Sequence, residues 1–140
     1  DDVDVEFYEE VTTANAGTDQ VVCYGPISSK MPGIFTTMQA NAPGANEEGL
    51  WTIETADPVA TGSFDDATDP NAVFTGEQDG SYVLRWTISP LAGTSPCPDS
   101  FDELNVDFPE NPPTATATDQ TVCSDTVTLD GSAPGTNNAV

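Results

Sequence analysis

Residues 82–88 read Tyr82-Val83-Leu84-Arg85-Trp86-Thr87-Ile88, and this stretch decides the fold class. Apolar residues occupy every second position along it, and Val83 is the one apolar residue on the opposite face. A period of two places successive side chains on opposite faces of a β-strand, so one face is predicted to be buried. We expect Tyr82 and Trp86 to share that face and to pack in the core.

Similar short runs occur before and after this stretch, bounded by Gly, Pro, Asn and Asp. The further predicted strands cover residues 3–7, 34–39, 50–54, 72–75 and 104–108. Because no segment shows a sustained apolar period of about 3.6 residues, no amphipathic helix is predicted. Short strands at this spacing predict an all-β protein, an antiparallel β-sandwich. Trp51 lies on one of the strands and is predicted, like Trp86, to pack in the core.

The chain is strongly acidic, with 24 Asp and Glu against 2 Lys and Arg, no His, and a formal charge of −22 over 140 residues. A nucleic-acid-binding protein needs many cations to neutralise phosphates, and Lys30 and Arg85 are too few for such a partner. An anionic membrane surface would repel the chain, and no apolar run of about 18 residues predicts membrane insertion. The lack of His excludes His-dependent catalysis and His-metal sites.

The sequence repeats itself with a period close to 100 residues. Residues 18–23 (TDQVVC) match residues 118–123 (TDQTVC) at an offset of 100, with five of six positions identical. Residues 42–46 (APGAN) match residues 133–137 (APGTN) at an offset of 91, which locates an insertion in residues 24–33. Collinear matches of this kind are the signature of a repeat architecture.

The two ends of the chain extend the repeat. Residues 3–9 match residues 104–110 at an offset of 101, since both combine an alternating apolar and polar strand with a following Glu. We expect residues 1–11 to be the last strand of a preceding repeat with its linker. Residues 12–111 are then one complete repeat, and residues 112–140 are the first strands of the following repeat. On this interpretation the chain is a piece of a longer tandem-repeat array.

The chain has three cysteines, an odd number that the repeat can explain. Cys23 opens the complete repeat and Cys97 lies near its end, so we expect a disulfide between them. Cys123 is the equivalent of Cys23, and its partner would lie beyond the chain. Such a disulfide implies an oxidising, extracytoplasmic location. The alternative is three free thiols in a cytosolic protein, whereas the lack of His and of a close Cys pair argues against zinc.

Acidic clusters are the candidate ligand sites. Asp65, Asp66 and Asp69 lie in a turn-rich loop and are weak candidates for Ca²⁺, which prefers several carboxylate and carbonyl oxygens. No stretch matches an ordered calcium loop, so a solvated acidic surface is the alternative and no metal site is assigned. Carboxylate pairs arise by number alone in so acidic a chain, and no nucleophile elbow or phosphate-binding loop is present. We therefore expect no catalytic residue, no cofactor-binding residue and no enzyme activity.

The segment Ala14-Asn15-Ala16-Gly17-Thr18-Asp19-Gln20, followed by Cys23, is similar to the opening of immunoglobulin-like, PKD-like repeats. The resemblance continues at Trp51, at residues 80–88 and at Cys97-Pro98-Asp99-Ser100. Such repeats occur in very large secreted surface proteins of Bacteroidetes, including gliding-motility adhesins exported by the type IX route. The resemblance implies an immunoglobulin-like sandwich at the cell surface. The insertion and the scarcity of Lys depart from the pattern.

The expected function is that of a non-catalytic structural or adhesive repeat of a long extracellular surface protein or fibre. Its expected partners are neighbouring repeats of the same array or filament, together with surface glycans or other cells. One alternative is a subunit of a self-assembling surface filament, held together by β-strand addition. Another is a carbohydrate-binding module, which requires an exposed aromatic platform and therefore exposed tryptophan side chains.

Overall fold

The computed structural model describes residues 2–23, 34–57, 61–109, 115–121, 123, 126–129 and 131. The insertion expected in residues 24–33 lies outside these described residues. The chain divides into two compact units, Asp1–Pro109 and Glu110–Val140. The described residues form strands, turns and loops without a helix, so none of them belongs to a helix that could cross a membrane.

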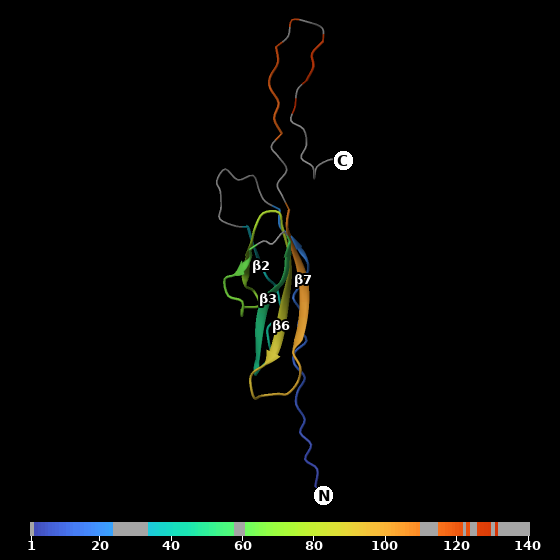
Figure 1. Cartoon of the computed structure of the whole chain (residues 1–140), viewed down its shortest axis with the longest axis vertical. Helices are drawn as coiled ribbons and strands as arrows, with labels where there is room; N and C mark the ends of the chain where they lie inside the picture. Colours follow the sequence, from blue (N-terminus) through green and yellow to red (C-terminus); the bar gives the residue numbers. More distant parts are fainter. Residues whose placement is uncertain are drawn as a thin grey trace. The chain divides into compact units, whose positions relative to one another are not determined.

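The described part of the first unit is a β-sandwich of two sheets (Figure 1). Its strands are β1 (Gln20–Val21), β2 (Ile34–Thr37), β3 (Glu47–Asp57), β4 (Ser63–Phe64), β5 (Val73–Gly76), β6 (Gly80–Pro90) and β7 (Ser100–Phe108). The four-stranded sheet has the order β1-β7-β6-β3, and the three-stranded sheet has the order β2-β5-β4. The all-β sandwich predicted from the sequence is confirmed.

The long strands β3, β6 and β7 lie side by side in the four-stranded sheet (Figure 1). β6 pairs antiparallel with both neighbours, and Trp86 lies opposite Trp51 on β3 and Asp102 on β7. Every second residue of β6 from Gly80 to Ile88 is buried, which confirms the alternation predicted for this stretch. All three strands extend beyond their predicted bounds, because pairing with a neighbour adds residues that do not themselves alternate.

The core lies between the two sheets and contains both tryptophans. Trp86, Tyr82 and Trp51 are 0%, 1% and 2% exposed, so their predicted core positions are confirmed. Phe74 of β5 lies 5.0 Å from the Tyr82 ring centroid, and its ring stacks on that of Phe108 at 6.3 Å. Aromatic contacts of this geometry contribute about 0.5–1.5 kcal/mol beyond the burial of apolar area.

The buried aromatic side chains also satisfy their polar atoms. The indole of Trp86 donates to the carbonyl of Asn41 at 3.1 Å, and that of Trp51 donates to the carbonyl of Asp69 at 3.2 Å. No described buried side-chain nitrogen or oxygen lacks a hydrogen-bond partner. The core therefore avoids the cost of about 1–3 kcal/mol that an unpaired buried polar group carries.

The first strand of the sandwich runs parallel to the last strand. β1 pairs with β7, where Gln20 lies opposite Val106. Gln20 and Val106 differ by 86 in residue number, and so do Ala16 and Asp102 upstream of them. The amide of Ala16 donates to the carboxylate of Asp102 at 2.9 Å, so the two segments also lie side by side there. The chain therefore enters the unit beside the start of β7 and leaves it at the end of β7, at the opposite end of the sheet.

Apart from shifts of strand ends, the structure differs from the predicted strands in three places. β1 and β4 were not predicted, because two residues are too few for an alternating pattern. Residues 3–7, predicted as the last strand of a preceding repeat, form no strand among the described residues. Its Val3, Val5 and Phe7 are 83%, 66% and 92% exposed. An alternating sequence forms a strand only where a neighbouring edge pairs with its backbone.

The second unit is described only in part. An isolated antiparallel bridge joins Ala117 to Gly131, and all described residues of this unit are exposed. Leu129 is 84% exposed, whereas Met38, its expected equivalent in the first unit, is fully buried. Equivalent sequence positions thus have opposite environments in the two units.

Candidate functional site

The calcium candidates Asp65, Asp66 and Asp69 lie in the loop between β4 and β5. Asp66 accepts hydrogen bonds from the hydroxyl and the amide of Thr68, at 2.7 and 2.9 Å, and these bonds lower the pKa of its carboxyl. Asp65 and Asp69 accept from the amides of Asp66 and Asn71, both at 2.8 Å. Asp66 and Asp69 therefore each close a local turn, whereas Asp65 also accepts from the amide of Val73 across the loop at 2.7 Å. The described residues contain no group of three or more Cys, Asp or Glu arranged to hold a metal ion.

The expected disulfide between Cys23 and Cys97 is not formed, and both thiols are free, as is that of Cys123. Cys97 precedes β7, whereas Cys23 follows β1, and the register of β1 with β7 places Cys23 beyond the opposite end of β7. At about 3.3 Å per residue, β7 alone separates the two ends by roughly 26 Å. A disulfide requires Cα atoms about 4.4–6.8 Å apart, so this fold excludes the pairing within one repeat.

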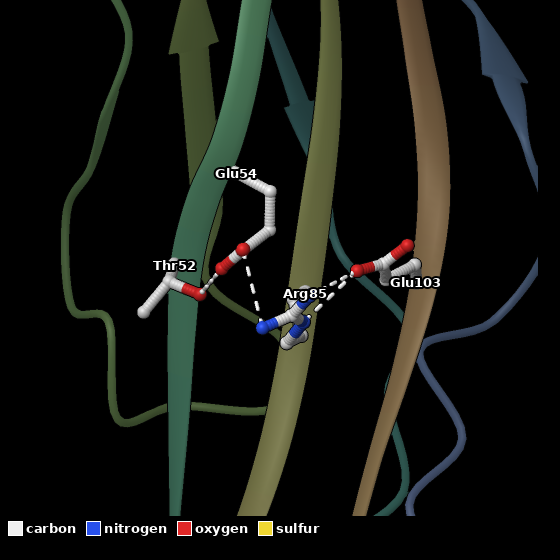
Figure 2. A network of polar contacts seen from close by, with 4 residues as sticks. All are labelled: Thr52, Glu54, Arg85 and Glu103. Carbon is white, nitrogen blue, oxygen red and sulfur yellow. Dashed lines mark hydrogen bonds and ion pairs between the residues drawn. The ribbon is translucent and has the colours of Figure 1, made fainter.

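A cluster of charged side chains on the four-stranded sheet was not foreseen from the sequence. Arg85 of β6 lies between Glu54 of β3 and Glu103 of β7 (Figure 2). Its Nη1 is 3.1 Å from Glu54, and its Nη2 and Nε donate to one oxygen of Glu103 at 2.6 and 2.9 Å. The hydroxyl of Thr52 donates to Glu54 at 2.7 Å, and the guanidinium lies 4.5 Å from the ring centroid of Phe101.

This charged cluster joins the three long strands across the sheet. Arg85 is the basic side chain that the described residues contain, and it is directed at two carboxylates and an aromatic ring. The side chains of Arg85, Glu54 and Glu103 are 32%, 30% and 40% exposed, so water screens their attraction. The arrangement is typical of a structural ion network rather than of a cation presented to a ligand.

We expect Arg85→Gln to lower the free energy of unfolding by about 1 kcal/mol, because two carboxylates lose their cation and Phe101 loses its cation–π contact. Urea denaturation measures the loss, which should shrink at about 1 M salt because exposed charges are then screened. Glu48→Gln on the same sheet is the control and should cost less than about 0.5 kcal/mol. Equal effects of the two substitutions would contradict the network.

Side chains of an Asp-Gln pair anchor β1 to both sheets. The carboxylate of Asp19 accepts from the backbone and side-chain amides of Asn105 on β7, at 2.8 and 3.3 Å. Gln20 reaches β2, where its amide nitrogen donates to the carbonyl of Thr37 and its oxygen accepts from the hydroxyl of Thr36. The Asp-Gln pair that recurs in the second copy therefore has a structural role in the first.

The Asp19 contact predicts a dependence of stability on pH. Hydrogen bonds from the backbone and then the side chain of Asn105 lower the pKa of Asp19 below its ordinary value of 3.8. A carboxyl group whose pKa is lowered by folding stabilises the fold at pH values above its ordinary pKa. This contribution is lost as the pH falls through the lowered pKa of the folded state. We therefore expect the melting temperature to fall less between about pH 5 and pH 2 in the Asp19→Asn protein than in the wild-type protein.

The pH measurement needs about 1 M salt, because acid otherwise also relieves the general charge repulsion. Asp4→Asn, an exposed aspartate outside the contact with Asn105, is the matched control and should show the wild-type decrease. An identical decrease in the Asp19→Asn and wild-type proteins would show that Asn105 does not stabilise the ionised carboxylate.

Neither tryptophan provides an exposed aromatic platform, since both are buried in the core. The exposed aromatic side chains among the described residues are Phe7, Tyr8, Phe35 and Phe101. Of these, Phe101 carries the guanidinium of Arg85 over its ring. The carbohydrate-binding interpretation thus loses the tryptophan platform that it requires.

The resemblance to immunoglobulin-like, PKD-like repeats remains an interpretation of the chain's own residues. No protein-family model matches the chain, and no curated protein matches it.

Proposed function

We propose that the chain is a piece of a tandem array of immunoglobulin-like sandwiches, which acts as a non-catalytic structural or adhesive repeat of a long extracellular protein or fibre. One observation carries the proposal: β1 pairs in parallel with β7, so the chain enters and leaves at opposite ends of the sandwich. Units connected in this way follow one another in a line, and each contacts only its neighbours.

The strand order supports the immunoglobulin-like part of the proposal. Immunoglobulin sandwiches place strands B, E and D in one sheet and strands C, F and G in the other. If β2 to β7 are equated with strands B to G, the observed orders β2-β5-β4 and β7-β6-β3 correspond to this arrangement. Tyr82, near the start of β6, accepts a hydrogen bond from the amide of Glu77 at 2.9 Å, as in the tyrosine corner of such domains.

The two chain ends support the tandem part of the proposal. Val3, Val5 and Phe7 are largely exposed, although the equivalent residues of β7, at an offset of 101, are at most 1% exposed. Leu129 is exposed where its equivalent Met38 is buried. Both ends therefore carry the core side chains of sandwiches that the described residues do not complete. Neighbouring repeats would complete them.

The charge supports an extended array. A charge of −22 in little more than one repeat makes a long array a polyanion. Such arrays repel one another and remain apart. The repulsion weakens when added salt shortens the electrostatic screening length below about 8 Å. Surface glycans or other cells are the proposed targets of an adhesive array.

A chain that completes the second repeat tests this function. Residues 133–137 match residues 42–46 at an offset of 91, so Val140 is the equivalent of Gly49. A copy of residues 50–109 joined after Val140 therefore supplies the strands that the second repeat lacks. In this two-repeat chain we expect slow hydrogen exchange at residues 126–129, which should exchange rapidly in the 140-residue chain used as control. X-ray scattering should show the two sandwiches end to end. Rapid exchange at residues 126–129, or a side-by-side particle, would contradict the proposal.

A self-assembling filament is a second candidate, because the exposed Val3, Val5 and Phe7 would also be buried if their segment added to a sheet of another copy. The two candidates differ in covalent length. Denaturing electrophoresis of the native material should give a band near 14.6 kDa if separate chains of this length assemble. A very large polypeptide supports the covalent array instead.

A further inference from the structure

The two cysteines of the complete repeat lie at its two ends. Cys97 lies where the chain enters, and its thiol contacts the carbonyl oxygen of Glu9 at 3.4 Å. Cys23 lies where the chain leaves, since the parallel register of β1 with β7, continued by two residues, places it beside Pro109. Each free thiol is therefore next to a segment that connects this sandwich to a neighbour.

The repeat brings these two positions to the same connecting segment. The strand-like segment before the linker matches β7 at an offset of 101, so Tyr8 is the equivalent of Pro109. In a preceding repeat the equivalent of Cys23 would lie beside Tyr8, and Cys97 contacts the next residue, Glu9. Paired strands are about 4.8 Å apart and successive Cα atoms about 3.8 Å, so the two cysteines would lie next to adjacent residues of the same connecting segment.

We propose that a disulfide joins Cys23 of each repeat to the equivalent of Cys97 in the following repeat, which rests on the proposed tandem array. Two thiols lose two protons and two electrons to form the S–S bond, and a disulfide oxidant such as oxidised glutathione is reduced to two thiols. Both cysteines are free in one repeat because their partners belong to different neighbours. Cys123, 100 residues after Cys23, has the same role at the next junction.

The exit end of the sandwich has room for the loop that carries the second thiol. A cavity of about 370 Å³ opens there, and Val21, Gly80, Phe108 and Pro109 contribute to its lining. Val21, two residues before Cys23, is 68% exposed. In this repeat, the loop that carries Cys97 begins with Leu91, an apolar residue that is 40% exposed. The same loop of the following repeat would begin with the equivalent of Leu91 and carry the equivalent of Cys97. The proposed occupant of this end is that loop.

The two-repeat chain holds both thiols of one such junction, Cys23 and the appended copy of Cys97. Oxidised glutathione should remove two of its four thiols and lower its mass by two hydrogen atoms. Peptide mapping without reduction should then show Cys23 linked to the appended cysteine. Cys23→Ser should abolish this loss of thiols, whereas Cys123→Ser is the matched control and should leave it unchanged.

Three results would overturn the proposal. The first is a disulfide between Cys23 and Cys97 within the first repeat. The second is four free thiols in a chain whose residues 126–129 exchange slowly, which leaves the array intact and removes only the disulfide. The third is rapid exchange at residues 126–129, which shows an unfolded second repeat and overturns the proposed function together with the disulfide.

Discussion

Trp86→Ala is expected to lower the free energy of unfolding of the sandwich by about 3–5 kcal/mol. The side chain is fully buried, its ring centroid lies 5.1 Å from that of Trp51, and its indole donates to Asn41. Truncation removes these contacts and leaves a cavity between the sheets. Because small domains are stable by about 5–15 kcal/mol, the loss takes a large part of the total.

Denaturant titration of the Trp86→Ala protein, followed by far-ultraviolet circular dichroism, measures this loss. Phe7→Ala is the control, since it also removes an aromatic ring, but one that is 92% exposed. The control should change stability by less than about 0.5 kcal/mol. Similar effects of the two substitutions would mean that Trp86 does not hold the sheets together.

Gly49→Ala is expected to cost about 1–3 kcal/mol through overpacking. A Cβ atom at Gly49 would lie 2.3 Å from two carbons of the Trp86 ring, and 3.0 Å from Pro43. The ring cannot yield easily, because Trp51 packs against it at 5.1 Å. The smallest possible side chain therefore forces a shift of either β3 or the indole.

Thermal and denaturant unfolding of the Gly49→Ala protein measure this cost. Gly131→Ala is the matched control, since the nearest atom to its new Cβ is an oxygen 3.9 Å away. That substitution should change stability by less than about 0.5 kcal/mol. A neutral Gly49→Ala would show that the indole does not lie over the glycine.

The strands that form the core were predictable because they alternate. The pattern around Trp86 is carried by one segment and needs no knowledge of a partner, since a buried face alone produces it. β1 was not predictable in this way, because its position depends on Asp19 and Gln20 reaching residues far along the chain. Residues 3–7 carry a strand pattern but have no partner edge among the described residues, so the pattern alone does not make them a strand here.

The candidate sites were less predictable than the core, because they depend on register. Arg85 meets Glu54 and Glu103 only when β6 is paired with both neighbours, and nothing in the local sequence marks the three residues as a group. The cysteine prediction failed for a related reason. The repeat indicates that Cys23 and Cys97 belong to one copy, but only the parallel pairing of β1 with β7 shows that they lie at opposite ends.

The parallel pairing of β1 with β7 also determines how one unit would resist a pulling force along the proposed array. Force drawn through the entry and exit points moves the two strands in opposite directions along their common axis. The bond from the amide of Val22 to the carbonyl of Asp107, at 2.9 Å, and the bonds of Asp19 are then loaded in shear and must break together. An antiparallel pair pulled from one end would unzip bond by bond. The sandwich thus places one of its two shortest strands, reinforced by side chains, where a pulling force would load it in shear.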